Sequence, residues 1–171
     1  MMTEAAVPVK RLLIVFHSLT GATRQLAAAI REGAAAEPAV AVSLCEAAVT
    51  GPGELEAADG YVFACPETLA SMSGQMKDFF DRCYYPALGR LEGRPYAVAV
   101  CAGSDGQGAI RQLERIVTGW RLRAIAPPLL VITRAQTAEA ILAPKTLPPQ
   151  ERQRAADLGA AFATGLAAGI F

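Results

Sequence analysis

A short loop with three hydroxyl side chains holds the first residues of this chain that could do chemistry. It reads His17-Ser18-Leu19-Thr20-Gly21-Ala22-Thr23 and joins a continuous apolar run to an alanine-rich stretch of helical period. The first backbone N–H groups of a helix lack partners and the helix dipole is positive there, so such a junction binds anions. Ser18, Thr20 and Thr23 can each donate to a phosphate oxygen, while Gly21 allows close backbone approach. The loop therefore predicts a phosphate site.

The type of phosphate follows from what the loop lacks. It contains no lysine or arginine, and the first basic residue after it is Arg24. A triphosphate would need the lysine and magnesium partners of a Walker loop, so a phosphate monoester held by neutral donors is favoured. The alternative is an ordinary Ser/Thr N-cap before a helix. His17, the only histidine, is either a capping or packing residue or a neighbour of the bound group, and we assign it no catalytic role.

Two further loops follow apolar runs that read as buried strands. The second loop begins at Pro66-Glu67-Thr68-Leu69-Ala70 and continues as Ser71-Met72-Ser73-Gly74-Gln75-Met76. The third, Cys101-Ala102-Gly103-Ser104-Asp105-Gly106-Gln107-Gly108, offers small residues and backbone amides. Its alternative reading is a flexible strand-to-helix turn, and Glu67 could be a solvated loop acid.

Five apolar stretches are expected to form strands, and three of them precede these loops. Strands are expected at 10–16, 40–44, 61–65, 96–102 and 129–133, the last at a sheet edge because Pro127-Pro128 precedes it. Helical periodicity predicts helices from Ala22 to about Pro38, from Ser71 to just before Pro86, over 110–120 and around 158–166, the last weakened near its end by Gly165 and Gly169. The segment between 133 and Pro149 reads as a loop.

Strands that alternate with helices require parallel crossovers, which place helices on both faces of the sheet. The predicted class is α/β and doubly wound. In such sheets ligands bind beyond the carboxyl ends of the strands, where the strand order reverses. The three loops, which follow Phe16, Cys65 and Cys101, are therefore expected to surround one site.

Composition limits the other possibilities. The 171 residues suit one domain over 1–171, and 53% are hydrophobic. Sixteen basic and sixteen acidic residues cancel without a basic stripe, so nucleic acid is not an expected partner. The apolar runs fall short of the roughly 20 residues of a membrane helix. The start MMTEAAVPVKRLL lacks the order of a signal peptide, so we expect a cytoplasmic protein.

The four cysteines show no metal or redox spacing. Cys45, Cys65, Cys83 and Cys101 form no CxxC pair. We expect buried free thiols, with Cys65 and Cys101 close together at strand ends, and no disulfide or metal site.

The first loop resembles the phosphate-binding signature of flavodoxins: serine or threonine, any residue, threonine, glycine, any residue, threonine. The resemblance implies the flavodoxin-like fold, a three-layer sandwich around a five-stranded parallel sheet of order 2-1-3-4-5. It also implies FMN as cofactor, with its phosphate on Ser18, Leu19, Thr20, Gly21, Ala22 and Thr23.

The second loop resembles the NAD(P)H:quinone oxidoreductases and related FMN reductases through proline, a few residues and then Met-Ser-Gly-Gln-Met. By this resemblance Pro66, Glu67, Thr68, Leu69 and Ala70 would meet the flavin ring, the last four through backbone groups. Gly103, Ser104 and Gly106 of the third loop would close its other side. The likeness spans about Lys10 to Leu122.

The resemblance implies an enzyme that takes hydride from NAD(P)H and reduces a small-molecule electron acceptor such as a quinone, with no catalytic side chain. The alternatives are a one-electron carrier and a module that has lost FMN and acts by protein contact. Carriers of this fold usually have a ring-stacking aromatic residue and are acidic, whereas here Leu69 and Ser104 stand in that neighbourhood and the chain is neutral. Related reductases are often dimers or tetramers, and Leu129 to Phe171 could supply such a surface.

Overall fold

The computed structural model describes residues 9–171, so the expectation about a signal peptide concerns a segment that lies mostly outside the described residues. Seven strands and six helices follow one another along this part of the chain. The strands are β1 (Lys10–Phe16), β2 (Val40–Glu46), β3 (Gly60–Thr68), β4 (Ser71–Met72), β5 (Pro95–Ala102), β6 (Arg123–Ala124) and β7 (Leu129–Ile132). The helices are α1 (Ala22–Ala34), α2 (Pro52–Ala57), α3 (Gly74–Ala87), α4 (Gln107–Gly119), α5 (Ala138–Leu142) and α6 (Pro149–Ala167).

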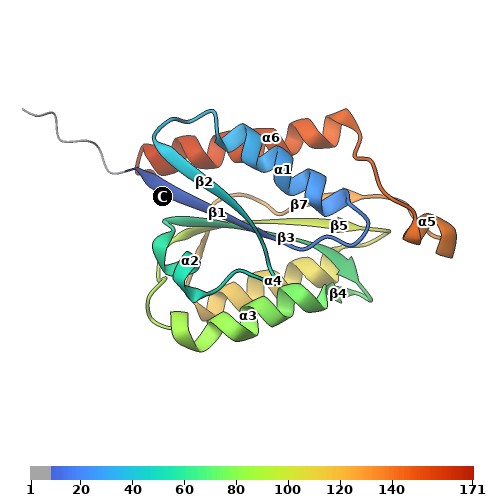
Figure 1. The fold of residues 1–171 in the computed structure, drawn as a ribbon, viewed down its shortest axis with the longest axis horizontal. Coiled ribbons are helices and arrows are strands. Elements are labelled where there is room, and N and C mark those ends of the chain that lie inside the picture. The colour runs from blue at the N-terminus through green and yellow to red at the C-terminus, as the bar shows by residue number, and fades with distance from the viewer. Residues whose placement is uncertain (1–8) are drawn as a thin grey trace, which may run out of the picture.

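The main sheet is parallel, with β1 between β2 and β3 (Figure 1). β5 lies on the other side of β3, and both β7 and the two-residue β6 pair with β5. The register aligns Val15 with Phe63 and Phe63 with Val98. The order β2-β1-β3-β5-β7 is the predicted order 2-1-3-4-5, and β7 is an edge strand as expected.

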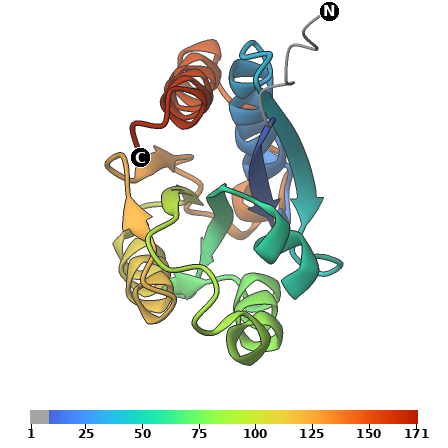
Figure 2. The same ribbon diagram turned by 90° about the vertical axis from the view of Figure 1, so that its left-hand side faces the viewer.

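Helices cover both faces of this sheet. Figures 1 and 2 show α1 and α6 on one face and α2, α3 and α4 on the other. Because side chains alternate along a strand, β1 sends Leu12 and Ile14 to the α1–α6 side and Leu13 and Val15 to the α3–α4 side. The two cores this creates are both predominantly apolar, which accounts for the unbroken hydrophobic runs in the strands.

The contact between α1 and α6 depends on two glycines. A Cβ atom at Gly33 would collide with the backbone of Ala156, and one at Gly159 would collide with the carbonyl of Ile30. The two helix backbones therefore approach more closely than side chains allow. This contact fixes the C-terminal helix, and with it the segment that precedes it, against the first helix.

Three local features differ from the sequence expectations. β3 runs on past Cys65 to Thr68 and turns back into β4, so the helical pattern expected from Ser71 begins only at Gly74. α3 also continues through Pro86 and ends one residue later at Ala87, so the helical hydrogen bond that proline cannot donate is lost only in the last turn.

The remaining differences lie in the C-terminal third. The segment expected to be a loop contains the single turn of α5, and α6 extends to Ala167 past Gly165. The ring of Phe171 fills the space where a Cβ of Gly165 would lie, so the glycine serves packing and does not end the helix.

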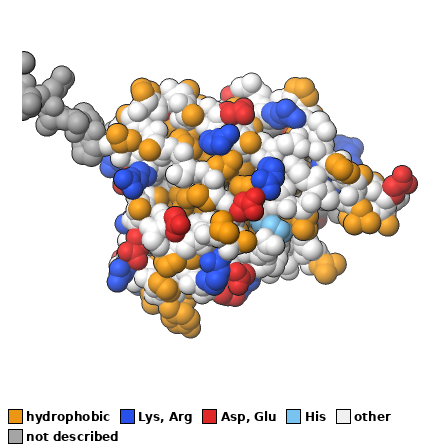
Figure 3. All heavy atoms as spheres, in the orientation of Figure 1, with side chains coloured by type: hydrophobic (Ala, Val, Ile, Leu, Met, Phe, Trp, Pro, Cys, Tyr) orange, Lys and Arg blue, Asp and Glu red, His pale blue; other side chains and the backbone are white. Residues whose placement is uncertain are grey.

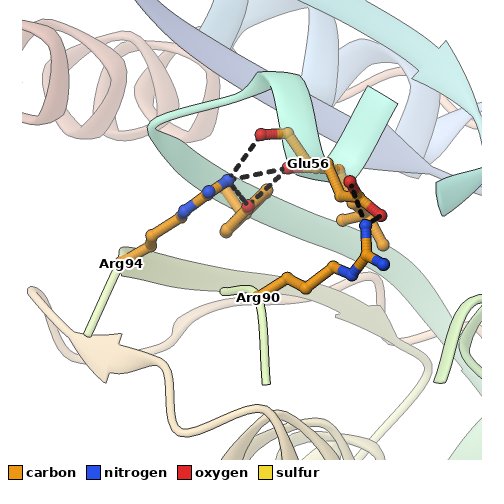
Figure 4. Close-up of polar contacts among 5 residues, drawn as sticks. Glu56, Arg90 and Arg94 are labelled. Carbon is orange, nitrogen blue, oxygen red and sulfur yellow. Dashed lines mark hydrogen bonds and ion pairs between the residues drawn. The ribbon is translucent and has the colours of Figure 1, made fainter. Parts of the chain in front are cut away.

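Arg94, just before β5, binds the end of α2 and the Tyr61 side chain of β3 (Figure 4). Its Nη1 donates to the carbonyls of Leu55 (3.2 Å), Glu56 (2.8 Å) and Ala58 (2.6 Å) and to the hydroxyl of the buried Tyr61 (3.0 Å). A cation beside the last carbonyls of a helix also suits the helix dipole. Figure 4 shows the nearby Arg90 reaching only the carboxylate of Glu56.

Replacing Arg94 with Met should lower the free energy of unfolding by about 2 kcal/mol, because polar groups around Tyr61 lose their donor. The matched variant Arg90→Met breaks only an exposed ion pair with Glu56 and should cost less than about 1 kcal/mol. Urea unfolding of both variants measures the difference. Equal losses would show that Arg94 contributes no more than a surface charge.

Candidate functional site

A cavity of about 470 Å³ lies where β1, β3 and β5 end, within the usual size of a small-molecule site. The three loops singled out from the sequence all line it. Twelve of the predicted residues contribute to its wall: Ser18, Leu19, Thr20, Ala22, Thr23, Pro66, Glu67, Thr68, Leu69, Ala70, Gly103 and Ser104. Gly21 and Gly106 are not among the lining residues; both have positive φ and serve as N-caps, of α1 and α4.

The start of α1 faces this cavity with hydroxyls and an uncapped helix end. Gly21 is the N-cap, with φ of 99°, and no side chain caps the helix. The Ser18 hydroxyl accepts a hydrogen bond from the Gly21 N–H at 3.2 Å, just before the helix. The first helical bond runs from the Gln25 N–H to the Gly21 carbonyl, so the N–H groups of 22–24 precede the helical ladder. The structure therefore does not have the ordinary Ser/Thr N-cap.

The second loop is a tight hairpin. Glu67 and Thr68 pair with Met72 and Ser71, which leaves Leu69 and Ala70 as a two-residue turn. Leu69 has φ of 51° and Ala70 has φ of 60°, conformations that cost energy for residues other than glycine. Leu69 is 95% exposed although it is apolar. An apolar side chain is thus held on a strained turn at the mouth of the cavity.

The hairpin is joined to the third loop by a side chain and by a close backbone approach. The Glu67 carboxylate accepts from the N–H groups of Gly106 (3.0 Å) and Ala109 (3.2 Å), at the start of α4. A Cβ at Gly108 would collide with the carbonyl of Ala70. Glu67 is therefore a structural link between the two loops and not a solvated acid.

The fourth wall of the cavity was missed by the sequence analysis. Besides Cys101 and Ala102 of β5, it comes from the segment that follows β7. The members of that segment in the wall are Thr133, Ala135, Gln136, Ile141 and Lys145. No periodic pattern or motif marks this segment, and its proximity to the first loop arises from long-range contacts, namely the packing of α6 on α1 and hydrogen bonds between Lys145 and both Thr20 and Gln25.

His17 lies beside the cavity and not in its wall. Its Nδ1 is 2.7 Å from the Ser73 hydroxyl, at the start of α3. Burial lowers the pKa of His17, and the nearby Glu46 carboxylate opposes this in part. His17 also borders a second, smaller cavity of about 240 Å³ on the β2 side of the first loop.

All four cysteines are free thiols, three of them buried. Burial raises the pKa of Cys65 to about 12 and that of Cys101 to about 11. These thiols stay protonated near neutral pH, so the Cys101 thiol in the cavity wall is not expected to act as a nucleophile. Within residues 9–171, no cluster of three or more acidic, histidine or cysteine side chains could hold a metal ion, and no helix is long and apolar enough to cross a membrane.

Comparisons with known proteins agree with this architecture. Solved structures that share it include an archaeal flavodoxin (TM-score 0.76, 18% identity, 91% of this chain and 98% of that one). A WrbA-like flavodoxin from Agrobacterium tumefaciens has a TM-score of 0.71 and 18% identity, covering 94% of this chain and 98% of that one. The chain has the flavodoxin-like fold.

Sequence comparisons find a similarity between part of this flavodoxin-like chain and reductases. Residues 53–137 match the family model described as NADPH-dependent FMN reductase. An NAD(P)H dehydrogenase (quinone) from Acidithiobacillus ferrooxidans is 30% identical over 119 residues, which are 57% of this chain. The match spans 60% of that relative's length.

The strained hairpin of this flavodoxin-like protein gives a first test. Replacing Ala70 with Gly should raise the free energy of unfolding by about 1 kcal/mol, because glycine adopts positive φ without a steric penalty. Ala28→Gly, inside α1, should instead lower it by about 1 kcal/mol. Thermal unfolding of both variants provides the comparison, and a loss of stability in both would show that the turn is unstrained.

The half-buried His17 gives a second test, by pH. Its lowered pKa means that the unfolded chain binds a proton more readily, so its contribution to stability is present above pH 6.5 and is lost as the pH falls. Urea unfolding between pH 7.5 and 5.5 should show a larger loss for the wild type than for His17→Gln. Parallel losses in the two proteins would contradict the burial of a neutral imidazole.

Proposed function

We propose that this protein is an FMN-dependent NAD(P)H oxidoreductase that reduces a small-molecule acceptor such as a quinone. The observation that carries the proposal is the cavity itself: three loops at the carboxyl edge of a flavodoxin-like sheet surround one space, with hydroxyls and a helix start at one end. The reductase family model overlaps two of these loops, since it covers 53–137.

The residues present fit FMN. Ser18, Thr20 and Thr23 line the end of the cavity beside the uncapped start of α1, which suits a phosphate monoester. The other walls are formed by the hairpin at Leu69 and by the chain around Gly103, which present backbone groups and apolar surface to a flat ring. The Glu67 carboxylate should repel a bound phosphate only weakly, because it accepts hydrogen bonds from the N–H groups at the start of α4.

The flavin, when bound, supplies the hydride and electron chemistry. The protein contributes binding and orientation. The hydroxyls of the first loop would hold the phosphate, and the link from Glu67 to Gly106 would keep the second and third loops at a fixed separation for the ring. No side chain needs to move a proton in this proposal, and the protonated Cys101 would be a passive part of the wall.

The acceptor reaches the site at the hairpin. None of the described residues that line the cavity is aromatic, and the apolar Leu69 at the mouth is exposed. An open flavin face without a stacked aromatic side chain favours a reductase over a one-electron carrier, the second candidate. The near balance of charge, with both signs interspersed on the face drawn in Figure 3, is also unlike a carrier that docks through one strongly charged surface.

A homodimer or tetramer is proposed from the relatives of this type, with a cytoplasmic location. Light scattering at micromolar concentration tests the assembly, and a monomeric mass would contradict it.

The visible spectrum of the purified protein tests the function. The protein is loaded with FMN, excess flavin is removed, and NADPH or NADH is added under anaerobic conditions, followed by a quinone. We expect retained flavin that a nicotinamide bleaches and the quinone restores. Bound flavin that resists both nicotinamides would support the carrier, and no retained flavin would support a module that acts by protein contact.

A further inference from the structure

The segment 133–147 runs across one side of the cavity and is fastened at both ends. At its start the Thr133 N–H donates to the Ala102 carbonyl (2.8 Å), and the Gln136 amide donates to the Gly103 carbonyl (3.2 Å). Between the ends, α5 lies at the edge of the molecule beyond the strand ends (Figure 1). The segment thus connects the third loop with the first.

Its far end is locked to the first loop through the backbone of Lys145. The Lys145 N–H donates to the Thr20 carbonyl at 2.8 Å, and the Lys145 carbonyl accepts from the Gln25 side chain at 2.6 Å. The same Gln25 amide donates to the Gly21 carbonyl (3.1 Å), and its oxygen accepts from the Leu147 N–H (3.0 Å). Lys145 is therefore held directly beside the turn at Thr20 and Gly21 whatever its side chain does.

Among residues 9–171, the Lys145 ammonium is the one cation in the cavity wall. Its Nζ donates to the carbonyls of Ile141 (3.0 Å) and Ala143 (2.6 Å), at the end of α5. Within the described part of the chain it forms no ion pair with a carboxylate. The one acid in the wall, Glu67, is engaged by the N–H groups of Gly106 and Ala109. The flexible, positively charged side chain of Lys145 thus has no carboxylate partner, and its backbone is held beside the first loop.

We infer that Lys145 is the charge partner of the phosphate monoester bound by the first loop, and so determines the preference for FMN over unphosphorylated flavin. This inference rests on the proposed function. A phosphate monoester carries between one and two negative charges near neutral pH, and the loop's own hydroxyls and N–H groups are all neutral. The Lys145 ammonium can compensate that charge if it leaves the neutral carbonyls of Ile141 and Ala143 and donates to phosphate oxygens instead. A hydrogen bond between two charged groups is the stronger type.

Flavin titrations of Lys145→Gln and Lys145→Arg test the inference, with quenching of flavin fluorescence as the readout. The fold should tolerate both changes, because the bonds to Thr20 and Gln25 use only the backbone of Lys145. For Lys145→Gln the Kd of FMN should rise about tenfold, as expected for loss of one charged hydrogen bond, and the Kd of riboflavin should not change. Lys145→Arg should bind FMN like the wild type, and Lys77→Gln, an exposed lysine of α3 that does not line the cavity, serves as the control.

Three results would overturn the inference. An equal rise in the Kd of FMN and riboflavin would show that Lys145 acts on the ring or the fold, and no rise in either would show that it does not act on the flavin. The FMN-loaded Lys145→Gln protein could instead keep its FMN affinity and bind NADPH more weakly relative to NADH. Lys145 would then be a partner of the nicotinamide cofactor and not of FMN. If the wild type binds neither flavin, the proposed function itself fails.

Discussion

Parallel pairing of β1 with both of its neighbours is the constraint on which the rest of this structure depends. Because β2 and β3 run in the same direction as β1, each must be reached by a crossover, and the crossovers place helices on both faces. The carboxyl ends of β1, β3 and β5 then open at a single edge. The loops that follow them therefore lie beside one another, so a cavity at this edge is a consequence of the topology.

The polar side chains around this cavity mostly build the loops. Glu67 holds the start of α4, and Ser18 accepts from the N–H of Gly21. His17 meets Ser73 outside the main cavity. What faces the cavity is accordingly a set of backbone groups, small hydroxyls and apolar surface. Such a lining suits a cofactor that brings its own reactivity and needs to be held and oriented.

The close contact of α1 with α6 has an effect beyond stability. It requires glycine at 33 and 159, and it sets the place from which the chain enters α6. The segment 133–147 is therefore brought back across the strand ends, where the Gln25 side chain of α1 binds the backbone of Lys145 and of Leu147. A packing contact on one face of the sheet thus supplies the fourth wall of the cavity, together with its one cation.

The resemblance of the first loop to flavodoxins implied the order of the sheet, and the sequence by itself determined the class of fold and three walls of the cavity. These follow from local signals: unbroken apolar runs such as Lys10–Phe16, helical periodicity after them, and hydroxyls or glycines at each junction. The loop from Ser18 to Thr23 could be recognised because its position between a strand and a helix is itself a local feature.

The tertiary structure alone decided the rest. Ser71 and Met72 take part in a hairpin because Thr68 and Glu67 lie opposite them, which overrides the helical pattern expected there. Glu67 became a link between loops because the start of α4 lies within its reach. Lys145 lies in the site although it is 122 residues beyond Thr23 along the chain, because its backbone is bound by Thr20 and Gln25. Such long-range contacts depend on which surfaces meet, and no local spacing in the sequence records that.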